Sequence, residues 1–258
     1  MGRLTRDRIG HGKLIMAQVG IAIGLPFGGR LVHPKWAVAL KTLDFPVNTT
    51  QTVISVEGQD VTTARNAIAK AAIENNCRYL WFLDDDVVVP RQTVQALGYL
   101  LDNGVEDKVM VSTEIYCTKT AFPAPVIYRD DTPGAFWDWK VNEVFDVDSA
   151  GAGCMMINTK VFEELEYPYF RTTEEYVDVN GEPCLTAVSE DIYFCRTVRV
   201  AGYKIRAHGA ILCPHYCEKQ NKFFALPEDS IPVKRELARQ QEEIQKKELE
   251  KEQHGRHE

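Results

Sequence analysis

The sequence predicts an α/β protein with a single domain built on a central, mainly parallel sheet. Large apolar residues fill positions 79–83, YLWFL, as is typical of a strand buried on both faces of a parallel sheet. Strand-like and helix-like segments alternate over residues 50–113, the pattern of layered α/β proteins. The chain has 258 residues, of which 45% are hydrophobic, enough for one sizeable core.

The overall composition excludes some classes of protein. A net charge of -7 argues against a generally basic nucleic-acid binder. Since no run approaches the ~20 apolar residues of a membrane helix, we expect a cytoplasmic protein without a membrane anchor. The 7 cysteines are scattered, several in apolar segments, which predicts reduced and buried thiols.

The first elements follow from apolar patterns and turn residues. A strand is expected within residues 14–25, closing at a turn over residues 26–29. Pro34 suits the first turn of a helix over residues 35–43. Alternating residues at 50–56 predict the second strand.

The next elements lead to the most informative stretch. Residues 64–74 have helical spacing, with Thr62 or Thr63 as the expected cap. The buried strand at 79–83 follows, and residues 91–101 form an amphipathic pattern typical of a helix.

The second half of the chain is less regular. A strand is expected at 109–113, and the aromatic segment 135–148 is interpreted as a hairpin or long loop whose rings favour the core. The Asn180-Gly181 pair predicts a small hairpin.

The last expected elements are a helix, two strands and a charged tail. The helix begins after Ser189 and ends at Gly202. Short closing strands are expected at 204–206 and 211–213. Residues 228–258 are expected to form a solvated helix with supporting charge pairs.

Three consecutive acids follow the buried strand. Asp84, Asp85 and Asp86 should lie where open α/β sheets bind ligands, outside the carboxyl ends of their strands. Adjacent carboxylates repel one another unless a cation lies among them. Asp84 and Asp86 are two residues apart, so they point the same way and suit a hard divalent cation. The alternative is a solvated acidic turn.

The segment WFLDDDVVVP resembles the Asp-x-Asp segment of GT-A fold glycosyltransferases, especially family-2-like enzymes. The resemblance implies a single GT-A-like, Rossmann-like domain over residues 13–227. A flexible basic start, 1–12, would precede this domain, and the charged tail, 228–258, would follow it.

The resemblance also implies roles for the three acids. Asp84 and Asp86 would hold Mn²⁺ or Mg²⁺ on the diphosphate of a nucleotide sugar, and Asp85 would contact the donor sugar or ribose.

Two further segments resemble the donor pocket of these enzymes. Ala64-Arg65-Asn66 resembles their "ARN" segment, and SAGAGCMMIN resembles their "GAG" segment through Gly151 and Gly153. The turn that begins at Pro26 corresponds to the loop that cradles the nucleotide base. The resemblance thus implies donor contacts from Pro26, Arg65, Asn66, Gly151 and Gly153. A surface arginine and a glycine bulge without a ligand remain the alternatives.

The final motifs concern catalysis and the metal. Glu190 and Asp191 resemble the family's "ED" pair, whose Asp is the catalytic base of inverting members; helix capping is the alternative. His215 lies where a third metal ligand would fall, although a structural histidine is also possible. A zinc site of Cys213, His215 and Cys217 is a competing interpretation with non-standard spacing.

Together these motifs imply a metal-dependent glycosyltransferase that moves a sugar from a nucleotide-sugar donor to an acceptor hydroxyl. The alternatives are a nucleotidyltransferase acting on a sugar phosphate and a non-catalytic nucleotide-sugar binder. The acceptor stays open among a small molecule, a glycan, a protein and modified DNA, and so does the choice between inversion and retention.

Overall fold

The computed structural model describes residues 20–130, 134–179 and 182–226. The expected basic start at 1–12, the turn at Asn180-Gly181 and the tail helix at 228–258 lie outside these described residues. The first strand was expected within residues 14–25, and its observed part begins at Ile21.

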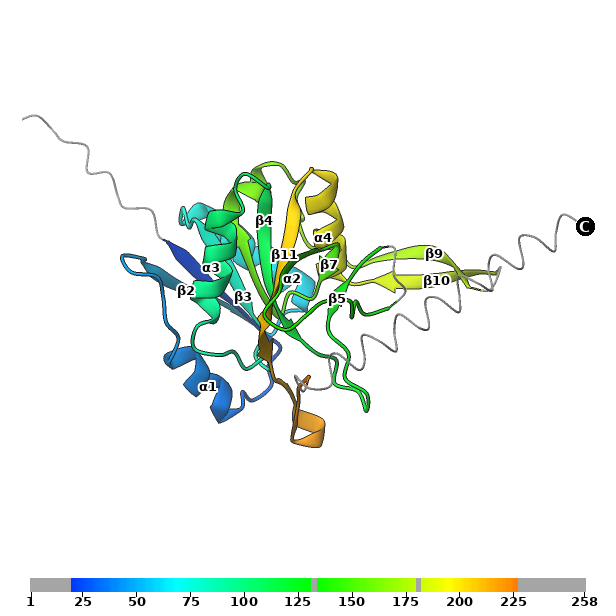
Figure 1. Cartoon of the computed structure of the whole chain (residues 1–258), viewed down its shortest axis with the longest axis horizontal. Coiled ribbons are helices and arrows are strands. Elements are labelled where there is room, and N and C mark those ends of the chain that lie inside the picture. The colour runs from blue at the N-terminus through cyan, green and yellow to red at the C-terminus, as the bar shows by residue number, and fades with distance from the viewer. Residues whose placement is uncertain (1–19, 131–133, 180–181, 227–258) are drawn as a thin grey trace, which may run out of the picture.

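A 7-stranded sheet forms the centre of the domain, in the order β2-β1-β3-β8-β4-β11-β6 (Figure 1). Its strands are β1 (Ile21–Phe27), β2 (Gln51–Glu57), β3 (Tyr79–Leu83), β4 (Val109–Tyr116), β6 (Val144–Val147), β8 (Cys154–Asn158) and β11 (Lys204–Cys213). Only β6 and β8 run antiparallel to their neighbours, and the other strands run parallel to one another. The mixed α/β fold with a mainly parallel sheet is therefore confirmed.

Helices cover both faces of this sheet. They are α1 (Pro34–Lys41), α2 (Val61–Glu74), α3 (Thr93–Asn103) and α4 (Glu190–Val200), with short 3₁₀ helices η1 (Thr159–Glu163) and η2 (Glu218–Gln220). One core cluster contains apolar residues of α2 and α4, and the other contains residues of α1 and α3. Strand β3 contributes alternate residues to both clusters, which explains its unbroken apolar run. No helix in the described part combines the length and apolar character needed to cross a membrane.

Three small strand pairs complete the structure. They are β9 (Thr173–Val179) with β10 (Glu182–Val188), β5 (Ile127–Tyr128) with β7 (Ser149–Ala150), and β12 (His215–Cys217) with β13 (Lys222–Phe224). The β9–β10 pair confirms the expected hairpin, which projects from the body of the domain (Figure 1). In the aromatic segment 135–148, Trp139 is buried in the core and its ring stacks on Phe145.

Several boundaries differ from the expectations. Pro26 lies inside β1 and not in the following turn. It is tolerated because β3 pairs with β1 only as far as Gly24, so the missing N–H of Pro26 faces no strand on that side. The cap of α2 is Asp60, not Thr62 or Thr63, because its carboxylate accepts a 3.0 Å hydrogen bond from the backbone N–H of Thr63.

The closing strands also differ from the expectation. Residues 204–206 and 211–213 belong to one strand, β11, with a register shift between His208 and Leu212. All 7 cysteines are free thiols; the buried ones are Cys77, Cys117, Cys154, Cys195 and Cys213.

Candidate functional site

The three acids emerge from the carboxyl end of β3, as the sequence predicts. Asp85 and Asp86 are buried, whereas 25% of the Asp84 side chain is exposed. The acids are therefore not a solvated surface turn. Buried carboxylates need cations or hydrogen-bond donors, and the surrounding segments supply both.

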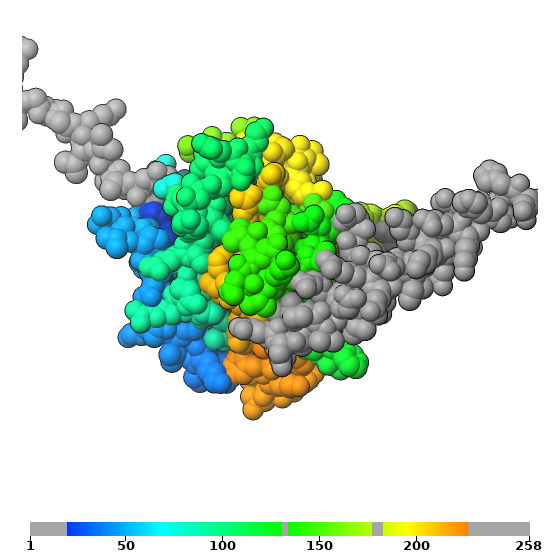
Figure 2. Space-filling view, viewed as in Figure 1, coloured from blue at the N-terminus to red at the C-terminus, as the bar shows by residue number. Residues whose placement is uncertain are grey.

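The backbone of the acids is fixed by three segments distant in sequence. The Asp84 N–H donates to the carbonyl of Gly153 at 2.9 Å, and the indole N–H of Trp36 donates to the carbonyl of Asp84 at 2.9 Å. The N–H of Tyr216 donates to the carbonyl of Asp86 at 2.7 Å. In the space-filling view, the blue α1 region and the orange segment around β12 and β13 lie beside each other at the bottom of the molecule (Figure 2).

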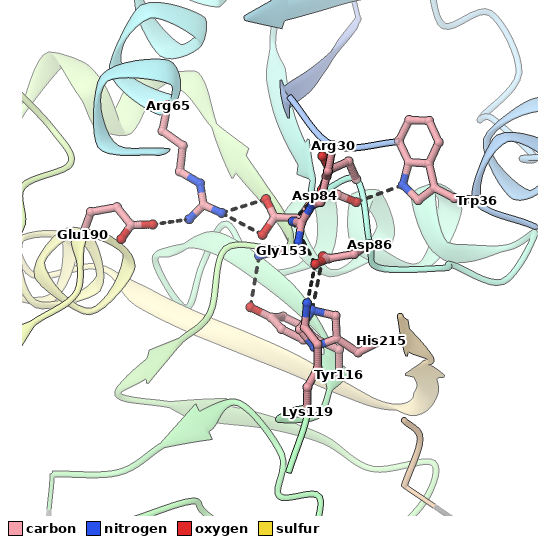
Figure 3. Close-up of polar contacts among 11 residues, drawn as sticks. Arg30, Trp36, Arg65, Asp84, Asp86, Tyr116, Lys119, Gly153, Glu190 and His215 are labelled. Carbon is pink, nitrogen blue, oxygen red and sulfur yellow. Dashed lines mark hydrogen bonds and ion pairs between the residues drawn. The ribbon is translucent and has the colours of Figure 1, made fainter. Parts of the chain in front are cut away.

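Asp84 belongs to a buried network with Arg65 and Glu190 (Figure 3). The Arg65 Nη2 atom donates to both carboxylate oxygens of Asp84, at 2.8 and 3.0 Å, and its Nη1 atom donates to Glu190 Oε1 at 2.7 Å. Burial opposes the charge of Arg65, but Asp84 and Glu190 raise the pKa of this guanidinium above its ordinary value. Burial raises the pKa of Glu190, although Arg65 acts in the opposite direction. Arg65 is therefore not a surface arginine.

Asp86 meets a different set of partners. Its Oδ2 atom contacts the Lys119 ammonium and lies 2.8 Å from Arg30 Nη2. Its Oδ1 atom lies 3.2 Å from His215 Nε2 (Figure 3). Burial favours the neutral acid, but the hydrogen bonds from His215 and Lys119 prevail and lower the pKa of Asp86 to about 2.

The orientation of His215 follows from its second nitrogen. Nδ1 of His215 lies 2.7 Å from the carbonyl oxygen of Cys117. Because a carbonyl oxygen only accepts, Nδ1 carries a proton. The carboxylate of Asp86 also only accepts, so a hydrogen bond from Nε2 to Asp86 needs a second proton on Nε2, whose place a metal ion would take. This arrangement, a histidine fixed by a backbone carbonyl, is also that of many metal-binding histidines.

Asp85 contacts neither His215 nor Lys119 but holds Arg30. The Nε and Nη2 atoms of Arg30 lie 2.8 and 2.6 Å from Asp85 Oδ1. The other oxygen, Oδ2, is buried and has no hydrogen-bond partner among the described residues. Arg30 thus bridges Asp85 and Asp86 from the turn after β1.

Asn66 lies outside these contacts and has a structural role. Its Nδ2 atom donates to the carbonyls of Thr62 and Phe170, at 2.9 and 2.7 Å. Its Oδ1 atom accepts a 3.1 Å hydrogen bond from the N–H of Phe170. The amide is thereby committed to holding the segment before β9 against α2, and Phe170 is buried beneath it.

The glycines Gly151 and Gly153 make room for Tyr116. A Cβ atom at Gly151 would lie 1.9 Å from the hydroxyl oxygen of Tyr116, and one at Gly153 would lie 3.0 Å from its Cζ atom. The N–H of Gly153 donates to that hydroxyl at 3.2 Å. The packing of Tyr116 against the backbone is therefore sufficient to explain why glycine stands at both positions. Gly153 still borders the acids, because its Cβ would lie 3.1 Å from Asp84 Oδ2.

Of the pair at the start of α4, Asp191 is the more exposed acid. Its Oδ1 atom accepts hydrogen bonds from the Ser189 hydroxyl and, at 2.8 Å, from the N–H of Ile192. Burial raises the pKa of Tyr116 well above its ordinary value, and the negative charges of Asp191 and Asp84 add to this. Asp191 is therefore close enough to influence the same site.

The expected metal set is only partly assembled. Asp86 and His215 are in contact, whereas Asp84 is held by Arg65. Over residues 20–130, 134–179 and 182–226, no group of three or more His, Cys, Asp or Glu side chains is arranged to hold a metal ion. The same finding gives no support to the zinc interpretation with Cys213 and Cys217.

Two cations of the site escaped the sequence reasoning in whole or in part. Arg30 lies just beyond the turn expected over residues 26–29, and no sequence motif contains Lys119. Lys119 follows β4 at the same edge of the sheet at which Asp84 follows β3. That shared position in the sheet is the signal that points to Lys119.

Comparison with known proteins supports the fold. No family model and no curated protein matches the chain. Among solved structures, the crystal structure of A197 from STIV is similar, with a TM-score of 0.54 and 18% identity over 81% of this chain and 94% of that chain. At this identity the likeness shows the fold alone, a mixed α/β domain with a central, mainly parallel sheet.

Proposed function

We propose that this protein is a GT-A-type glycosyltransferase that uses a divalent cation to move a sugar from a nucleotide-sugar donor to an acceptor hydroxyl. The observation that carries the proposal is the contact between Asp86 and His215. These residues are separated by 129 positions in sequence, yet Oδ1 and Nε2 lie 3.2 Å apart at the carboxyl edge of the sheet. An oxygen and an imidazole nitrogen at a sheet edge suit a transition metal such as Mn²⁺.

Asp86 and His215 fit a divalent cation by their chemistry, and they are the residues that would hold it. Asp84 would add a third ligand once Arg65 released one of its oxygens. When bound, the cation would supply positive charge to the leaving diphosphate of the donor. The proposal therefore takes Asp86 and His215 as the primary ligands, with Asp84 as a secondary one.

Glu190 and Asp191 have different roles in this proposal. Glu190 is buried and bound by Arg65, so it positions Arg65 and Asp84. Asp191 is half-buried at the first turn of α4, where it is able to accept a proton from an acceptor hydroxyl. We assign Asp191 as the base if transfer inverts the sugar centre.

The donor contacts of the proposal also need revision. Arg65 acts through Asp84, which it binds. Asp85 acts through Arg30, whose side chain reaches both Asp85 and Asp86. Asn66 is not proposed to contact the nucleotide sugar, because its amide group is hydrogen-bonded to the backbone of Thr62 and Phe170. Gly151 and Gly153 border Tyr116, and Gly153 also borders Asp84. Pro26 lies in β1, one residue before that strand ends.

The proposal is tested with a panel of nucleotide sugars in the presence of MnCl₂. We expect one of them to raise the melting temperature and to be hydrolysed slowly to its nucleoside diphosphate. The Asp86→Ala variant should lose both effects while staying folded. A panel without any binding, or unchanged hydrolysis by Asp86→Ala, would contradict the proposal.

The products separate the alternatives that share this site. Release of pyrophosphate from a nucleoside triphosphate and a sugar phosphate would identify a nucleotidyltransferase. Binding of a nucleotide sugar without turnover, even with a range of acceptor hydroxyls, would identify a non-catalytic binder.

A further inference from the structure

Three cations surround the acids, and they are held with unequal firmness. Arg65 has a side chain that is only 3% exposed and is bonded on two sides, to Asp84 and Glu190. Arg30 is more exposed, but two of its nitrogens bind Asp85, whose side chain is 1% exposed. Removal of either arginine would leave a buried carboxylate without its cation, which is costly.

Lys119 is held differently from both arginines. Its side chain is 26% exposed, between the values of Arg65 and Arg30, and the difference lies in its bonding: its ammonium group contacts Oδ2 of Asp86, which has other partners. If Lys119 moved away, Asp86 would keep Arg30 at 2.8 Å and His215 at 3.2 Å. A lysine ammonium is a point charge on a flexible stem, so it exchanges partners at lower cost than a bidentate guanidinium. Of the three cations, Lys119 is the one suited to leave.

The position of Lys119 matters for any second cation. Lys119 places its charge on the acid that, with His215, would hold a divalent cation. Two positive charges at one carboxylate repel each other, and the repulsion is screened less where the carboxylate is as buried as that of Asp86, whose side chain is 5% exposed. The anionic oxygens of a diphosphate provide an alternative partner for a displaced ammonium group.

From this arrangement we propose that Lys119 occupies the cation position on Asp86 in the ligand-free protein and transfers to the diphosphate of the ligand when that ligand arrives. This inference rests on the proposed function and assigns Lys119 as a binding residue for the diphosphate class of ligand. It predicts that the divalent cation alone binds weakly, because it must displace Lys119. The diphosphate relieves this competition, so the two ligands bind with positive coupling.

The test is a Lys119→Met variant of the full chain, which keeps the length of the side chain and removes its charge. Mn²⁺ binding is followed by the electron paramagnetic resonance of free Mn²⁺, and binding of pyrophosphate without metal is followed by calorimetry. The variant should bind Mn²⁺ about tenfold more tightly and pyrophosphate about tenfold more weakly, the size expected for one hydrogen bond to a charged group. Effects of opposite sign on the two ligands are not expected from a general disturbance of the fold.

Two further variants serve as controls. Lys222→Met removes an exposed lysine of β13 whose ammonium lies over the Phe224 ring, so both affinities should stay as in the wild type. Lys119→Arg should restore pyrophosphate binding because it retains the charge. Melting temperatures of all variants establish that each is folded.

The outcomes separate this inference from the proposed function. If the wild type binds Mn²⁺ and pyrophosphate but Lys119→Met changes neither affinity, the role of Lys119 is overturned and the proposed function stands. If both affinities fall in Lys119→Met, the exchange is likewise overturned, since Lys119 would then support the cation site. If the wild type binds neither ligand under any condition, both the inference and the proposed function fail.

Discussion

Asp84 and Asp86 are separated by one residue, yet their environments differ in kind. Asp84 is neutralised by Arg65, a buried guanidinium that Glu190 holds from the other side. Asp86 is paired with Lys119 and Arg30, whose side chains are partly exposed, and with His215, which follows β11 at the same edge of the sheet. The comparison teaches that the two ends of the acid triad, Asp84–Asp86, differ in the burial of their cations: Asp84 is bound by a buried guanidinium, and Asp86 by partly exposed cations. We call these the closed end and the open end.

The largest expected effect on stability comes from removing the buried cation of the closed end, Arg65. Arg65→Met should lower the free energy of unfolding by about 3–5 kcal/mol, because the buried Glu190 and the partly buried Asp84 lose their shared cation. Lys119→Met, at the open end, should cost about 1 kcal/mol or less. Urea unfolding of both variants checks the difference. Equal losses would mean that the two ends do not differ as described.

The second effect concerns Asn66, which adjoins Arg65 in sequence. Asn66→Ala should cost about 3 kcal/mol, since the N–H and the carbonyl of Phe170 would lose their partner in a buried place. The affinity for nucleotide sugar should not change, because Asn66 does not contact the acids. A variant with normal stability and weakened ligand binding would restore the donor role that the sequence implied.

The third effect is the pH dependence of stability that Asp86, at the open end, should cause. The pKa of Asp86, about 2, is below the unfolded value of 3.8, so its contribution is complete above pH 3.8 and is lost as the pH falls towards 2. In metal-free buffer, the wild type should lose about 2 kcal/mol more than Asp86→Asn between pH 5 and pH 2. Identical pH profiles for unfolding would show that Asp86 is not charged and paired in the folded protein.

The fourth effect concerns a second buried acid, Glu114. His208 Nδ1 lies 3.9 Å from its Oε2 atom, but burial lowers the pKa of His208 and so disfavours its charged form. Both carboxylate oxygens of Glu114 lack a hydrogen-bond partner among the described residues, and burial raises the pKa of Glu114 well above 4.5. A raised pKa favours the protonated folded state, so this contribution is lost as the pH rises through and above 4.5. Glu114→Gln should therefore gain stability relative to the wild type between pH 5 and pH 8. A constant difference over this range would contradict the assignment.

The sheet and the place of the acid triad were predictable because local patterns determine them. The apolar run of β3 identifies a strand buried on both faces, and the carboxyl end of such a strand is a binding edge. The partners of the acids were not predictable, because they depend on chain segments brought together by the fold. Glu190 is 125 residues from Arg65, and Lys119 is 33 residues from Asp86.

Two expectations, the donor contact of Asn66 from the resemblance and the turn at Pro26 from turn residues, were less secure for a related reason. A motif gives the residue type but not its partners. The sequence therefore predicted a ligand contact for Asn66, whereas its amide is hydrogen-bonded to the backbone of Phe170. The sequence predicted a turn at Pro26 because proline usually ends a strand. Here the neighbouring strand β3 had already stopped pairing with β1 before that residue.

The most direct test of the account is a crystal structure with MnCl₂ and the nucleoside diphosphate released in the panel assay, measured for the anomalous scattering of manganese. We expect the anomalous peak between the carboxylate of Asp86 and Nε2 of His215, with Lys119 turned from Asp86 to a phosphate oxygen. A peak elsewhere on the protein, with Asp86 still bound to Lys119, would contradict the account.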